Sequence, residues 1–289
     1  MDSSELLKKV RKIEIRTKAL SQQVFSGQYH SAFKGRGMAF SEVREYQYGD
    51  DIRNIDWNVT ARFNHPYIKI YEEERELTVM LLIDVSGSTQ FGTKQQFKSD
   101  LITEISAVLS FSAINNNDKV GVIFFSNQVE KFIPPQKGRS HILRIIRELV
   151  DYKPKQVETN LSEALRYLTN AIKKKCTAFI LSDFIGCEFE QALKIAANKH
   201  DVVAFQISDK GDLLLPNLGL VRIHDPETGK MAVADTLNSN VKKEYARWWS
   251  IQQKRNLEVF KKSGVDVAYI LTNKDYVKAL SELFLRRGA

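Results

Sequence analysis

The sequence predicts an α/β fold with a doubly wound, mostly parallel, Rossmann-like sheet, and two observations support this prediction. Short apolar runs of strand length recur along the chain, at 77–83, 119–125, 177–181, 201–207 and 265–271. Segments with apolar residues at helical spacing alternate with these runs, at 94–116, 140–150, 160–173, 188–199 and 275–287. Such alternation is typical of a parallel sheet whose crossover helices cover both faces.

Composition allows a sizeable core and excludes several classes of protein. Hydrophobic residues make up 43% of the 289 residues, which is enough for a packed interior. No run reaches the roughly 18 apolar residues of a transmembrane helix, and the N-terminus, MDSSELLKKV, lacks the apolar core of a signal peptide. Cys176 and Cys187 are too few for a disulfide framework. We therefore expect a cytoplasmic protein without a transmembrane segment.

The chain is expected to have two parts. Residues 1–76 combine an amphipathic helical pattern over 3–24 with a glycine-containing arm, and both are expected to pack on the main domain. Residues 77–289 contain the alternating strands and helices and form that main domain.

Two segments depart from the alternation of strands and helices. Residues 129–133 are expected to form a short edge strand that Pro134-Pro135 stops. Near 212–237, two apolar stretches flank the turn sequence Asp225-Pro226-Glu227-Thr228-Gly229. These turn residues predict an inserted β-hairpin.

Five oxygen-bearing side chains follow predicted strands or precede a predicted helix. Asp84 ends the first buried strand and is followed by Ser86 and Ser88; Asp183 ends the strand at 177–181, and Thr159 precedes a helix. These two strands are expected to flank the point where the strand order reverses, which brings their carboxyl ends together. Carboxylates and hydroxyls suit Mg²⁺, with Mn²⁺ or Ca²⁺ as alternatives. The competing interpretation is that the Asp and Ser side chains only cap the next helix.

These five residues, in this order, resemble the metal-ion-dependent adhesion site of the von Willebrand factor A domain. The resemblance extends from about Leu77 to the C-terminus. It implies that Ser86, Ser88 and Thr159 meet a metal directly or through water, while Asp84 and Asp183 act through water. It also implies one coordination position left for an acidic side chain of a partner. The implied function is a protein-interaction (adaptor) module and not an enzyme.

A longer stretch resembles a particular bacterial family. The segments GRGMAFSEVREYQYGDDIRNIDWNVTAR and YEEERELTVMLLIDVSGS are similar to domain-of-unknown-function family fifty-eight, in which an arm precedes a von Willebrand A-like domain. Tyr48 stands before Gly49 where the family usually has proline. The resemblance implies partnership with a MoxR-type AAA+ ATPase, which would act on a client protein that this chain helps to select. The client is not identified by the sequence.

Two other classes of function compete with this interpretation. A Mg²⁺-dependent phosphoester hydrolase could use Asp84 as nucleophile, but such enzymes need a second acid two residues later, where this chain has Ser86. A nucleic-acid binder could use the basic helix at 244–262 with Trp248 and Trp249, in a chain of net charge +8. We favour a solvated helix whose tryptophans pack on the sheet, so no nucleic-acid partner is expected.

Overall fold

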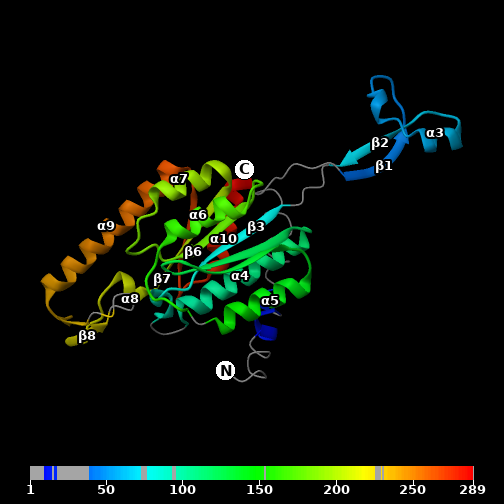
Figure 1. Cartoon of the computed structure of the whole chain (residues 1–289). Coiled ribbons are helices and arrows are strands. Elements are labelled where there is room, and N and C mark those ends of the chain that lie inside the picture. Colours follow the sequence, from blue (N-terminus) through cyan, green and yellow to red (C-terminus); the bar gives the residue numbers. More distant parts are fainter. Residues whose placement is uncertain are drawn as a thin grey trace. The chain divides into compact units, whose positions relative to one another are not determined.

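A computed structural model describes the fold (Figure 1). The chain divides into two compact units, Lys34–Leu77 and the larger unit of Met1–Phe33 with Thr78–Ala289. Residues 1–33 thus group with the sheet domain and not with the arm. The expected packing of the arm on the main domain stays a prediction. The described residues are 10–14, 16–17, 39–72, 77–92, 96–152, 154–224, 229 and 231–288.

The large unit contains a six-stranded sheet in the order β10-β7-β6-β3-β4-β5. Its neighbouring strands are parallel except for β4 and β5, which are antiparallel. The predicted α/β fold with a doubly wound, mostly parallel sheet is therefore confirmed. The strands are β3 (Thr78–Asp84), β4 (Lys119–Phe125), β5 (Val129–Gln136), β6 (Thr177–Ser182), β7 (Asp201–Ser208) and β10 (Asp266–Leu271).

Helices cover both faces of this sheet. Figure 1 shows α6 and α7 on one side and α4 and α5 on the other. No helix in the described part of the chain combines the length and the apolarity needed to cross a membrane. The long helices are α4 (Lys98–Asn115), α5 (Arg139–Asp151), α6 (Leu161–Ala171), α7 (Glu190–Lys199), α9 (Ser239–Ser263) and α10 (Tyr276–Gly288).

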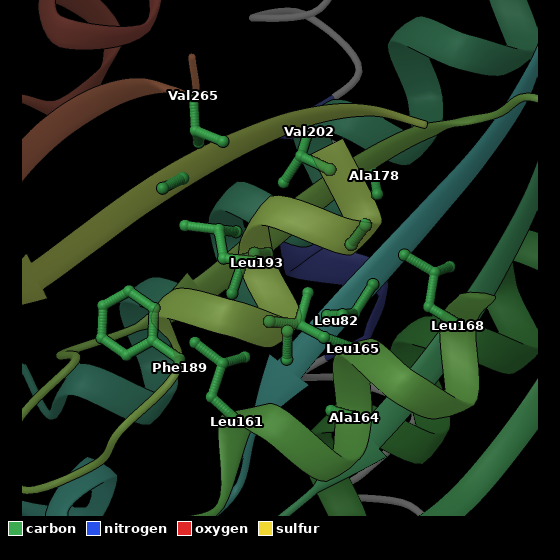
Figure 2. Close-up of a cluster of buried hydrophobic side chains, with 14 of the residues drawn as sticks. Leu82, Leu161, Ala164, Leu165, Leu168, Ala178, Phe189, Leu193, Val202 and Val265 are labelled. Atoms are coloured by element: carbon green, nitrogen blue, oxygen red, sulfur yellow. The ribbon is translucent and has the colours of Figure 1, made fainter. Parts of the chain in front are cut away.

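The central strand β3 is buried on both faces. On one face Leu82 belongs to a buried cluster with α6 and α7, in which Leu165 and Leu193 also lie (Figure 2). Side chains alternate along a strand, so Leu81 points to the opposite face, and it too is fully buried. A strand buried on both sides has a continuous apolar sequence, which explains the run at 77–83.

The edge strand β5 is longer than expected. It was predicted to stop at Pro134-Pro135, but this prediction is wrong, because β5 continues to Gln136. Prolines are tolerated at a sheet edge, where their missing N–H groups do not interrupt an inner ladder. The register shifts opposite Gly121, where a Cβ atom would lie 2.9 Å from the Pro135 nitrogen. Glycine therefore makes room for the proline-containing strand.

The excursion between β7 and α9 contains the predicted hairpin. Thr236 is buried at its base, where its Oγ1 donates to the Gly219 carbonyl (2.8 Å) and accepts from the Leu218 N–H (3.1 Å). The strands carry exposed apolar side chains, including Leu220 at 77% and Val233 at 69%. The turn residues 225–228 lie outside the described residues. The elements are α8 (Lys210–Leu213), β8 (Leu220–His224) and β9 (Met231–Asp235), with the two strands antiparallel.

Helix α9 begins five residues before the expected 244. The Asn238 side chain caps its start by accepting from the Asn240 N–H, and Gly264 ends it at a positive φ of 64°. Trp249 is buried, as expected of a residue that packs on the domain, whereas Trp248 remains 43% exposed.

The N-terminal helical segment contacts the large unit in the part that is described. Residues 10–14 and 16–17 are helical, while the rest of the predicted helix lies outside the described residues. Arg16 forms an ion pair with Glu104 of α4 at 2.8 Å, and Glu14 pairs with Arg139 of α5. These contacts favour the expected packing of this segment on the main domain.

The small unit is a two-stranded antiparallel sheet with short helices between its strands. Its acidic side chains are used locally: Asp50 pairs with Arg44 at 2.8 Å, and Asp56 caps α3 by accepting from two backbone N–H groups. The elements are β1 (Ala39–Glu45), η1 (Ile52–Asn54), α3 (Trp57–Phe63) and β2 (Tyr67–Glu72).

Candidate functional site

The loop after β3 is organised by Asp84. This residue is 1% exposed, and both carboxylate oxygens accept hydrogen bonds, one from the Ser86 N–H (2.9 Å) and one from the Ser182 hydroxyl (2.6 Å). The short helix η2 (Gly87–Gln90) follows. Ser86 Oγ and Ser88 Oγ lie 3.1 Å apart, so the two hydroxyls can share one ligand.

The loop that carries Thr159 lies beside the β3 loop. The Gly87 N–H donates to the Val157 carbonyl at 2.8 Å, and the Asn160 N–H donates to the Ser126 carbonyl at 2.8 Å. These bonds hold the chain on either side of Thr159 against the ends of β3 and β4. Asn160, and not Thr159, caps α6 through its side chain. The structure thus brings Thr159 into the neighbourhood of the serines.

Asp183 lies at the same edge of the sheet as Asp84. It directly follows β6, and β6 pairs with β3 in a register that places Leu181 opposite Ile83. The prediction that these two strands bring Asp84 and Asp183 together is therefore confirmed by the strand order. One oxygen of Asp183 accepts from the Ile185 N–H at 3.2 Å.

A buried lysine occupies the other oxygen of Asp183. The ammonium of Lys98, the first residue of α4, lies 3.0 Å from Asp183 Oδ2 and 2.8 Å from Asp212 Oδ2, and its side chain is 2% exposed. Neither Lys98 nor Asp212 was found from the sequence, because no spacing or motif marks them. Ser182 was also missed, although its position directly before Asp183 was a usable signal.

Negative charge is concentrated at this edge. Burial, together with the charge of Asp183, raises the pKa of Asp84 to about 7, although hydrogen bonds from Ser182 and Ser86 oppose this shift. Burial alone would lower the pKa of Lys98, but Asp183 and Asp212 outweigh it, and the net direction is upward. Asp183 and Asp212 therefore share one ammonium, while Asp84 is repelled by the charge of Asp183, and a further cation nearby would reduce this repulsion.

The donor groups fit an oxygen-preferring cation only in part. In the residues that the structure describes, no group of three or more His, Cys, Asp or Glu side chains could hold a metal ion. A metal here would depend on hydroxyl oxygens, and Ser86 with Ser88 provides a close pair of them. Asp183, by contrast, already holds Lys98. The assignment of all five residues to a metal stays a prediction.

The sheet order and this loop cluster define a doubly wound α/β domain whose candidate site lies at the carboxyl ends of β3 and β6. The family described as "Protein of unknown function DUF58" matches residues 42–255, and the chain belongs to this family. A Mycobacterium tuberculosis relative, "Uncharacterized protein Rv1480", is 27% identical over 294 residues, which cover 100% of this chain and 92% of the relative. The Bacillus subtilis protein YeaD is 27% identical over 109 residues, covering 38% of this chain and 25% of YeaD.

Solved structures with similar folds were also found. The conserved hypothetical protein BatB from Bacteroides thetaiotaomicron is 18% identical, with a TM-score of 0.48, and the match covers 73% of this chain and 98% of BatB. The SpRpn10 VWA domain is 11% identical, with a TM-score of 0.40, and covers 73% of this chain and 95% of its own length.

Proposed function

We propose that this chain is a metal-dependent protein-interaction (adaptor) module that recognises an acidic side chain of a partner. The hydroxyls of Ser86, Ser88 and Thr159 hold Mg²⁺, with Mn²⁺ or Ca²⁺ as alternatives, and Asp84 and Asp183 orient water around it. The bound ion supplies an electropositive position that accepts a carboxylate. The observation that carries the proposal is the Asp84-anchored loop, in which two serine hydroxyls lie 3.1 Å apart.

The surroundings of Asp84 favour binding over phosphoester hydrolysis. Asp84 is 1% exposed and each of its carboxylate oxygens accepts a hydrogen bond, which limits both the access of a substrate to these oxygens and their nucleophilicity. Ser86 stands where a general acid would be needed.

The proposed partner is a MoxR-type AAA+ ATPase, and the proposed role is to select the client on which that ATPase acts. Membership of the DUF58 family supports this partner. A cytoplasmic location belongs to the same proposal, and it is supported by the two free thiols, Cys176 and Cys187, which suit a reducing compartment.

The test measures metal binding and partner binding separately. Calorimetric titration of MgCl₂ into the metal-free full chain should give a saturable signal that Asp84→Ala abolishes. Capture of a purified MoxR-type ATPase should need Mg²⁺, fail in chelator and fail with Asp84→Ala.

A matched control is Asp151→Ala, which removes an exposed aspartate at the end of α5. This variant should bind metal and partner like the original chain. Partner capture that persists in chelator and in Asp84→Ala would contradict the metal-dependent interaction.

A further inference from the structure

Lys98 is unusual in its burial and in its contacts. Lysine is almost never fully buried unless its charge is paired, and here the ammonium lies between two carboxylates, Asp183 at 3.0 Å and Asp212 at 2.8 Å. It also lies 5.7 Å from the centroid of the Phe91 ring, within cation–π range. Three groups from separate parts of the chain therefore hold one positive charge inside the site.

The same ammonium faces the residue that the proposed metal would need. Asp183 Oδ1 accepts a backbone N–H and Asp183 Oδ2 contacts Lys98, so most of its charge is already neutralised. A divalent ion at Ser86 and Ser88 gains less from a carboxylate that is paired with an ammonium than from an unpaired one. Lys98 and the metal would therefore both interact with the negative charge of Asp183.

Asp212 also pairs with the Lys98 ammonium and so affects how strongly this ammonium interacts with Asp183. It belongs to α8, where the Asp209 N–H donates to its carboxylate at 2.8 Å and the Tyr245 hydroxyl of α9 donates to its backbone carbonyl at 2.9 Å. These bonds fix the position of α8 next to Lys98. Part of the ammonium's charge is thereby directed away from Asp183.

We propose that Lys98 is a tethered cation that competes with the divalent ion for Asp183, and that Asp212 sets the strength of this competition. This inference rests on the proposed metal-dependent function. Removing the ammonium leaves Asp183 unpaired and strengthens metal binding. Removing the charge of Asp212 leaves the ammonium entirely to Asp183 and weakens metal binding. The two substitutions therefore change metal affinity in opposite directions.

The experiment titrates MgCl₂ into the metal-free full chain and follows heat of binding and the rise in melting temperature. Lys98→Met, which keeps the length of the side chain, should bind Mg²⁺ about tenfold more tightly, the scale of one charge pair at this distance. Asp212→Asn should bind Mg²⁺ several-fold more weakly. Lys254→Met, which removes one charge from an exposed lysine of α9, should leave affinity unchanged and controls for net charge.

The outcomes separate this inference from the proposed function. Suppose that the original chain binds Mg²⁺. If both site variants then bind it with the original affinity, or if both affinities change in the same direction, the competition is refuted and the proposed function stands. If only Lys98→Met binds Mg²⁺, the competition is supported and the function of the original chain fails. If no variant binds Mg²⁺, both are refuted. If Lys98→Met does not fold, Asp212→Asn alone decides. Weaker Mg²⁺ binding by this variant supports the inference, and unchanged or tighter Mg²⁺ binding overturns it.

Discussion

Cys176 and His200 form a contact between residues that are far apart in the sequence. His200 Nδ1 lies 3.2 Å from Cys176 Sγ, and both residues are buried at the amino ends of β6 and β7. Burial raises the pKa of the Cys176 thiol to about 12. Burial, reinforced by the charge of Lys199, lowers the pKa of His200 to about 4. Both groups are therefore neutral at neutral pH, and the pair is a structural contact and not an activated nucleophile.

His200 makes the stability of the fold depend on pH. Its pKa is about 4 in the folded chain, against about 6.5 in an unfolded one. Between these values the unfolded chain binds a proton that the folded chain does not, so the stabilising contribution of neutral His200 is lost as pH falls. We expect this contribution to decrease by about 2 kcal/mol between about pH 7 and about pH 4.5.

Urea unfolding at several pH values checks this expectation, with His200→Asn as the reference variant. Asparagine retains an acceptor near the position of Nδ1 and does not titrate in this range. The difference in unfolding free energy between the original chain and the variant should therefore shrink in acid. Parallel pH profiles for the two proteins would show that His200 does not contribute.

At the scale of elements, the β8–β9 hairpin differs from the strands of the central sheet. Two-stranded hairpins are at best marginally stable alone in water. This one is fastened at its base by buried Thr236, while Leu220 and Val233 face solvent. Its strands therefore add little apolar burial to the fold.

Polar substitutions on the hairpin should leave stability almost unchanged. Leu220→Ser and Val233→Ser are each expected to alter the free energy of unfolding by less than about 0.5 kcal/mol, because both side chains are mostly exposed. Leu165→Ala is the matched core variant; it empties a fully buried position in α6 and should cost about 2–5 kcal/mol. Urea unfolding measures both, and a loss on the hairpin as large as the core loss would contradict this interpretation.

Most elements could be predicted from the sequence because their apolar periodicity reflects burial. The strand at 77–83 is an example, since β3 is enclosed on both faces. The end of β5 could not be predicted in the same way, because a proline stops an inner strand but not an edge strand, and edge position depends on the whole sheet. The extra turn of α9 depends on the cap at Asn238, a local signal that periodicity does not contain.

The candidate site was predictable where its residues follow strands and unpredictable where they do not. Asp84 and Asp183 each end an apolar run, so parallel pairing of β3 and β6 brings them to one edge. Lys98 begins a helix, a position where lysine is usually solvated. Its burial depends on Asp212, which belongs to an excursion more than a hundred residues later in the chain.

For the whole molecule, the core belongs to the large unit. Among the residues whose burial is described, which leave out 34–42 and 70–76, Ile68 is the buried hydrophobic side chain in Lys34–Leu77, and the other buried hydrophobic residues lie in the large unit. The stability of a domain depends mainly on its buried apolar core, and the described core of the large unit is built from its own residues. We therefore expect the large unit to fold without the small one.

A chain in which a flexible Gly/Ser linker replaces residues 34–77 should show cooperative thermal unfolding by circular dichroism. Its melting temperature should lie within about 4 °C of the original value, which corresponds to roughly 1 kcal/mol for a domain of this size. The segment 34–77 expressed alone should lack a cooperative transition. A truncated chain that melts without cooperativity would show that the small unit is needed for the core.

The two prolines of β5 also bear on self-association. Neither Pro134 nor Pro135 can donate a backbone proton. Because successive N–H groups of a strand point to opposite sides, the pair removes a donor from the outer flank of β5, which weakens pairing there with a strand of another molecule. Exposed edge strands can otherwise pair with strands of other molecules, and such pairing leads to fibrous aggregates. Continuation of the sheet past β5 is therefore disfavoured, and assembly through this side of the sheet is expected to depend on side-chain contacts.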